Sequence, residues 1–153
     1  MTNTYTQIHL QIVFAVKYRE GAIRSSWKNE LYKYITKIIQ NNGHKMICIN
    51  GMPDHIHILI GVRPAQSISE LLREVKSNSS KWINEKKLVS GKFEWQEGYG
   101  AFSYSKRDLR NVINYIENQE IHHGTASFKM EYESFLKEFE IEYNERFVFK
   151  ELV

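Results

Sequence analysis

Two histidines separated by a single residue stand in the short apolar run HIHILI at residues 55–60. In a β-strand alternate side chains lie on the same face, so His55 and His57 would project about 6–7 Å apart from one side of a sheet. Neutral imidazole is a common ligand of divalent metal ions, so the pair can chelate one cation, although a His-x-His pair taken alone is more often structural or incidental. The preceding Asp54 can either orient an imidazole by a hydrogen bond or serve a turn.

A tyrosine and a glutamine lie four residues apart within a predicted helix over residues 106 to about 122. At 100° per residue, Tyr115 and Gln119 share one face of this helix, beside an apolar stripe of Leu109, Val112, Ile113 and Ile116. A tyrosine at the margin of such a stripe is commonly an amphipathic residue with its hydroxyl in water. The spacing alone therefore assigns no chemistry to Tyr115.

The elements that must position these side chains follow from periodicity and turn residues. Strands are expected at residues 7–16, 45–50 and 55–60, with a turn at 51–54 and a fourth strand assembled from 93–95 and 101–104. One helix is expected from a cap at Ser25 or Ser26 to Gly43, and a second from a capping box at Ser67 to about Lys87. The helix over residues 106 to about 122 has Ser105 as its cap, and a last helix is expected from about Ser127 to Phe139.

This order, β-α-β-β-α-β followed by helices, predicts an α+β fold: a ferredoxin-like split βαβ antiparallel sheet with additional C-terminal helices. The length of 153 residues corresponds to one domain over 1–153. Two helices would cover one face of the sheet. The C-terminal helices and a partner chain are the material available for the other face.

The distribution of charge and the composition limit the kinds of protein and the compartments that fit this sequence. Residues 1–125 hold 17 Lys and Arg against 11 Asp and Glu, whereas residues 126–153 hold 4 against 7, so a basic body precedes an acidic tail. The single Cys48 excludes an intrachain disulfide and favours a reducing compartment, which we take to be the cytoplasm. We expect no membrane segment, and the chain lacks the glycine-rich motifs of nucleotide cofactor sites.

Basic side chains on two predicted helices are candidates for contact with DNA phosphates. Arg73 and Lys76 fall on the second helix, and Lys106, Arg107 and Arg110 on the helix that carries Tyr115. A solvated helix face explains the same residues equally well.

Taken together, the two constellations resemble a known family. DHIHILI at residues 54–60 on an internal strand and VINYIENQ at 112–119 on a late helix closely resemble the His-hydrophobic-His (HUH) single-tyrosine transposases of bacterial insertion sequences, the IS200-like family. The resemblance extends over almost the whole chain. It implies that His55, His57 and Gln119 bind a divalent metal, Mg²⁺ or Mn²⁺, and that Tyr115 is the nucleophile.

The same resemblance implies a function. A transposase of this kind acts on single-stranded DNA with hairpin ends, and it nicks and rejoins strands by tyrosine transesterification through a 5′-phosphotyrosine. Because a tyrosine hydroxyl has a pKa near 10, attack at neutral pH needs an activating cation. A homodimer is implied as well, with composite sites in which the tyrosine helix of one subunit docks beside the histidines of the other.

Three alternatives remain open from the sequence. The chain can be a domesticated, repeat-associated relative with the same chemistry, or a catalytically inactive module that binds single-stranded or hairpin DNA. It can also be a metal-dependent hydrolase in which His55 and His57 activate water.

Overall fold

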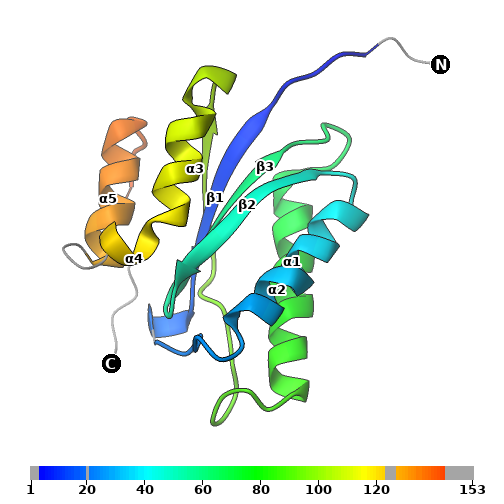
Figure 1. Cartoon of the computed structure of the whole chain (residues 1–153), viewed down its shortest axis with the longest axis vertical. Coiled ribbons are helices and arrows are strands. Elements are labelled where there is room, and N and C mark those ends of the chain that lie inside the picture. Colours follow the sequence, from blue (N-terminus) through cyan, green and yellow to red (C-terminus); the bar gives the residue numbers. More distant parts are fainter. Residues whose placement is uncertain (1–3, 20, 123–126, 144–153) are drawn as a thin grey trace.

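The computed structural model describes residues 4–19, 21–122 and 127–143. Four antiparallel strands form one sheet in the order β2-β3-β1-β4, and they comprise β1 (His9–Ala15), β2 (Lys45–Met52), β3 (His55–Gly61) and β4 (Gly100–Tyr104) (Figure 1). The helices are α1 (Lys28–Asn41), α2 (Ile68–Glu85), α3 (Leu109–Glu117), α4 (Gln119–His122) and α5 (Phe128–Glu138), with 3₁₀ turns η1 (Lys17–Arg19) and η2 (Lys106–Asp108). The predicted α+β, ferredoxin-like arrangement is confirmed.

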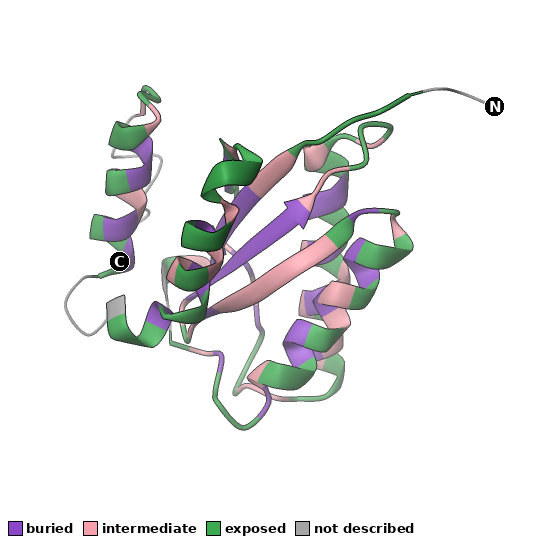
Figure 2. Cartoon of the chain, turned by 45° about the horizontal axis from the view of Figure 1, so that its top comes forward, coloured by how far each residue is buried: buried purple, intermediate pink, exposed green. Residues whose placement is uncertain are grey.

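The two faces of the sheet carry different side chains. Ile56, Ile58 and Ile60 of β3 join the main apolar core together with buried residues of α1 and α2. His55, His57 and Leu59 alternate with them and therefore lie on the other face. Figure 2 shows β3 buried along nearly its whole length, because helices cover both of its faces.

The second face is covered by the C-terminal half of the chain. α3 and α4 pack on β2, while α5 packs on the central and edge strands β1 and β4. The ring of Phe135 on α5 stacks on Phe102 of β4, with centroids 4.9 Å apart and planes inclined by 19°. The histidine face is thus enclosed between α3 and α5 (Figure 1). Of the helices in the described part of the chain, none has both the length and the apolar character needed to cross a membrane.

Several element boundaries differ from the sequence prediction. α1 begins at Lys28 with Trp27 as its N-cap, so the predicted cap at Ser25 or Ser26 is wrong. β4 starts only at Gly100, and the 93–95 segment contributes one isolated bridge, Val16 to Trp95. By contrast, the cap at Ser67 is confirmed, since its side chain accepts a hydrogen bond from the Glu70 amide at 3.1 Å.

The helix predicted from residue 106 to 122 starts as a different kind of turn and is broken once. It begins as the 3₁₀ turn η2, continues as α3, and is interrupted at Asn118 before α4 begins at Gln119. The side-chain amide of Asn50 on β2 donates to the carbonyls of Ile116 and Glu117 at 3.0 and 3.2 Å. Because these carbonyls are taken by β2, the end of α3 is fixed by a tertiary contact.

Candidate active site

The two histidines of β3 are fully buried and lie side by side. Their exposed fraction is 0%, and their ring centroids are 5.1 Å apart with planes inclined by 73°. Each imidazole is held at Nδ1 by a separate oxygen. Asp54 Oδ1 lies 2.7 Å from Nδ1 of His55, and Gln11 Oε1 lies 2.7 Å from Nδ1 of His57.

Gln11 also defines which nitrogen of His57 carries a proton. Its Nε2 donates to the hydroxyl oxygen of Tyr104 at 3.1 Å, so its carbonyl oxygen must face the imidazole. Nδ1 of His57 therefore donates to Gln11. A neutral ring then offers the Nε2 lone pair to a metal ion, whereas a protonated ring donates from Nε2 to Oε1 of Glu131. A hydrogen bond of this kind orients a histidine that binds a metal.

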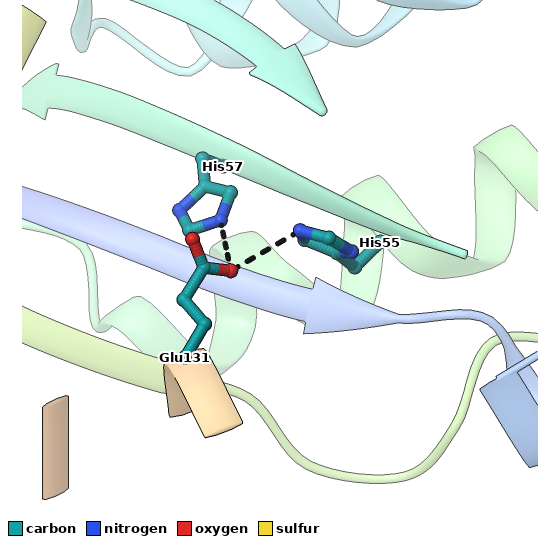
Figure 3. A group of neighbouring side chains, drawn as sticks. All are labelled: His55, His57 and Glu131. Carbon is teal, nitrogen blue, oxygen red and sulfur yellow. Dashed lines mark hydrogen bonds and ion pairs between the residues drawn. The ribbon is translucent and has the colours of Figure 1, made fainter. Parts of the chain in front are cut away.

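The Nε2 atoms of both histidines face one carboxylate oxygen. Glu131 on α5 places its Oε1 3.2 Å from Nε2 of His55 and 3.0 Å from Nε2 of His57 (Figure 3). The Glu131 side chain is buried, with 4% of its surface exposed. One ligand atom from each of the three residues lies within 4.8 Å of the others, an arrangement that can hold a metal ion.

Tyr115 and Gln119 complete this cluster. The Tyr115 hydroxyl donates to Oε2 of Glu131, and its ring lies edge-on to His57 with centroids 5.9 Å apart. Gln119 is fully buried, with its Oε1 3.2 Å from Nε2 of His55 and its Nε2 donating to Glu131 at 3.2 Å. The structure thus brings all four residues that the sequence singled out, His55, His57, Tyr115 and Gln119, together within one chain.

Burial and the hydrogen bonds of this cluster shift the pKa values of three of its side chains. Burial alone would lower the pKa of His55, but hydrogen bonds to the Asp54 and Glu131 carboxylates outweigh it and raise the pKa to about 9. Burial opposes ionisation of Glu131, yet hydrogen bonds from His55 and His57 hold its pKa well below the usual range. Burial and then the Glu131 carboxylate raise the pKa of Tyr115 above that of a free tyrosine. In the absence of a cation, the tyrosine is therefore kept protonated.

A cleft leads to this cluster from the surface. It has a volume of about 850 Å³ and lies between α3 and α5, with Tyr115 and Glu131 in its wall. Tyr104 and Phe139 line the cleft as well. Tyr115 and Glu131 therefore border the same hollow.

The predicted DNA-contacting residues do not form one group. Arg73 and Lys76 lie on α2, across the sheet from Tyr115, and Lys76 Nζ donates to the backbone carbonyls of Gln96 and Gly98. Lys106, Arg107 and Arg110 are exposed on η2 and α3, on the same side as the cleft. A DNA role for either set stays a prediction.

Two residues of the cluster escaped the sequence analysis. Gln11 is a polar residue at a buried position of β1. Its neighbour Ile12 faces the main core, so the side chain of Gln11 lies on the other face of the sheet. Glu131 sits between Phe128 and Phe135, three residues after the first and four before the second, so it interrupts an apolar helical stripe. A carboxylate in the middle of such a stripe is the signal that the sequence offers, whereas the charge balance alone assigns Glu131 only to the acidic tail.

Comparison with known proteins gives a consistent result. The family model of IS200-like transposases matches residues 4–119. The ISDra2 transposase TnpA of Deinococcus radiodurans is 26% identical over 119 residues, covering 74% of this chain and 84% of that protein. The transposase of insertion sequence element IS200 from Salmonella typhimurium is 25% identical over 125 residues, covering 78% and 81%.

Two solved structures share the fold. A crystal structure of a protein assigned as a transposase in Deinococcus radiodurans R1 has a TM-score of 0.63 and 22% identity, covering 78% of this chain and 95% of that one. A REP-associated tyrosine transposase bound to a REP hairpin has a TM-score of 0.62 and 16% identity, covering 82% and 74%.

Proposed function

Because this chain belongs to the IS200-like transposase family, we propose that it nicks and rejoins single-stranded DNA with hairpin ends by tyrosine transesterification. The observation that carries the proposal is a convergence of four side chains on the buried carboxylate of Glu131, beside an open cleft: those of Tyr115, His55, His57 and Gln119. A tyrosine that served only packing would not need its hydroxyl at such a place.

The reaction conserves the phosphodiester bond. The hydroxyl oxygen of Tyr115 attacks the scissile phosphorus and gives up its proton, an O–P bond forms, and the bond from phosphorus to the 3′ oxygen breaks. The 3′ oxygen takes up a proton and leaves as a free 3′-hydroxyl, while the 5′ end stays on the protein as phosphotyrosine. A second 3′-hydroxyl reverses these steps and reseals the strand, so no nucleotide cofactor is required.

We propose that His55, His57 and Gln119 hold a divalent metal ion, Mg²⁺ or Mn²⁺. The donor set fits, since the Nε2 atoms of His55 and His57 lie beside the same buried oxygen and the Gln119 Oε1 lies 3.2 Å from Nε2 of His55. The Nδ1 atoms of both rings are already held by Asp54 and Gln11. Imidazole nitrogen favours Mn²⁺ somewhat over Mg²⁺. When bound, the ion would withdraw charge from a phosphate and lower the pKa of an adjoining hydroxyl.

Partners and location remain part of the proposal. We expect hairpin-ended single-stranded DNA as substrate, action in the cytoplasm, and a homodimer as the family resemblance implies. The geometry supports a site completed within one chain, because α3 already places Tyr115 beside the histidines of its own β3. Mixing Tyr115→Phe with His57→Ala tests composite sites: recovered activity would show that subunits exchange their tyrosine helices, and no recovery would support sites within one chain.

The direct test is covalent capture. The chain is incubated with single-stranded hairpin DNA and Mn²⁺ or Mg²⁺, and a denaturant-resistant adduct is sought by gel electrophoresis and mass spectrometry. We expect an adduct at Tyr115 that is absent with EDTA, with duplex DNA and in Tyr115→Phe. Tyr34→Phe, on α1 across the sheet, is the matched control and should form the adduct normally.

The alternatives give different outcomes in the same assay. Cleavage without an adduct that persists in Tyr115→Phe would identify a hydrolase that uses water. Hairpin binding with neither cleavage nor adduct would identify an inactive binding module. Either result would overturn the proposed transesterification.

A further inference from the structure

One carboxylate contacts every residue of the proposed catalytic cluster, and it lies outside the segment that the family model matches. The match ends at residue 119, whereas Glu131 belongs to α5. We propose that Glu131 is a further ligand of the metal centre, with Oε1 on the ion and Oε2 holding the hydroxyl of Tyr115. This inference rests on the proposed function and deepens it.

The distances fit such a role. Oε1 lies 3.2 and 3.0 Å from the Nε2 atoms of His55 and His57. Two ligand atoms at about 2.1 Å from an ion and at right angles are separated by about 3.0 Å. Each of the two nitrogen–oxygen pairs therefore already has the spacing of neighbouring ligands around a small divalent cation.

Charge and chemistry agree with the distances. Imidazoles bind a metal as neutral rings, so two of them and an amide would bring no charge to balance a divalent ion, while an ionised carboxylate brings one negative charge and a hard oxygen donor. Glu131 is the carboxylate that supplies this donor, since its Oε1 faces both Nε2 atoms. Its burial ensures that the charge is weakly screened by water.

The second oxygen gives the same residue a positioning role. Oε2 accepts the hydrogen bond of Tyr115 and also one from Gln119 Nε2 at 3.2 Å. The carboxylate would thereby hold the hydroxyl of Tyr115 beside the metal position. α5 is anchored on the sheet by Phe128 and Phe135, which lie on either side of Glu131 and are buried.

Metal binding by the full chain, measured without DNA, tests this role. Isothermal titration and the loss of the free-ion EPR signal would give the affinity for Mn²⁺. We expect Glu131→Gln to weaken binding at least about tenfold. Glu133→Gln, the same substitution two residues along α5, should stay within about twofold of the wild type.

A second variant separates ligation from charge. Glu131→Asp keeps the negative charge but withdraws the carboxylate by one methylene, so a ligand role predicts a loss as large as that of Glu131→Gln. Tyr115→Phe should leave Mn²⁺ affinity nearly unchanged, because it removes the hydrogen bond and keeps the ligand. Circular dichroism confirms that each variant is folded.

Three results would overturn the inference. Wild-type affinity in Glu131→Asp together with a loss in Glu131→Gln would mean that the charge acts only through space. Unchanged or tighter binding in Glu131→Gln would mean that the carboxylate leaves when the ion arrives. Unchanged binding in His57→Ala would place the metal elsewhere, and the metal site of the proposed function would fall with the inference.

Discussion

Replacing Gln11 by leucine tests whether the tautomer of His57 is set by a hydrogen bond. Gln11 is 1% exposed, and its Oε1 accepts from Nδ1 of His57 at 2.7 Å. Leucine has a similar volume but no acceptor, so Nδ1 loses its partner at a position without access to water. The hydroxyl of Tyr104 also loses a donor, but it borders the cleft and can bind water instead.

The expected losses follow from these contacts. One orphaned buried donor costs about 1–3 kcal/mol of unfolding free energy, and each kcal/mol lowers the Tm of a domain of this size by about 2–4 °C. The ring can escape the cost by moving its proton to Nε2, which removes the lone pair offered to a metal. Loss of such an orienting partner weakens metal binding about 10–100-fold, or about 1.4–2.7 kcal/mol.

Differential scanning calorimetry and Mn²⁺ titration of the same preparations measure both quantities. Gln11→Glu is the control, because it keeps an oxygen acceptor at the same place and should retain the metal affinity. If Gln11→Leu melts as the wild type does and binds Mn²⁺ within about twofold of it, then packing alone orients His57 and the reasoning is refuted.

Three further substitutions or measurements probe the surrounding structure. Phe135→Ala removes a ring that is 7% exposed and stacked on Phe102, so urea unfolding should show a loss of about 3–5 kcal/mol, and a loss below 1 kcal/mol would mean that α5 is not anchored there. Asn50→Ala should lower the free energy of unfolding by about 1 kcal/mol in the same assay, because the last carbonyls of α3 lose their amide donor. An unchanged urea midpoint would show that water replaces the amide. Burial, and then the Glu117 carboxylate, raise the pKa of Cys48 from 9.0 to about 12, so alkylation by iodoacetamide should keep accelerating above pH 9, and a plateau near pH 9 would contradict this. The thiol of Cys48 ionises at a lower pH in the unfolded chain than in the folded one, so its contribution should lower the free energy of unfolding as the pH rises from 9 towards 12.

The parts of the site that depend on local periodicity could be predicted from the sequence. The alternation of β3 correctly placed His55 and His57 on the face opposite Ile56, because the side-chain period of a strand is two. Helical periodicity likewise brought Tyr115 and Gln119 to one face, even though the helix breaks at Asn118 between them.

The break itself could not be predicted, since its cause is not local. No glycine or proline interrupts residues 106–122, and the carbonyls that would continue α3 are bound by Asn50 from a distant strand. Gln11 was missed for the same reason, and the sequence marks Glu131 only as a carboxylate within an apolar stripe, without indicating what it contacts. Their roles depend on the register of β1 against β3 and on the docking of α5, which residue spacing does not encode.

α5 contributes to the site and to the packing of the sheet, so an experiment must separate the two contributions. The helix supplies Glu131 to the cluster, but it also buries Val13, Ala15 and Phe102 of the sheet. Deleting everything after residue 122 would expose that apolar surface and remove the carboxylate together, so a loss of activity would have two causes. The substitution Glu131→Gln replaces one carboxylate oxygen by an NH₂ group and leaves the apolar contacts of α5 in place. Point substitution is therefore the informative way to decide whether the catalytic unit ends with the family match at residue 119 or extends through α5.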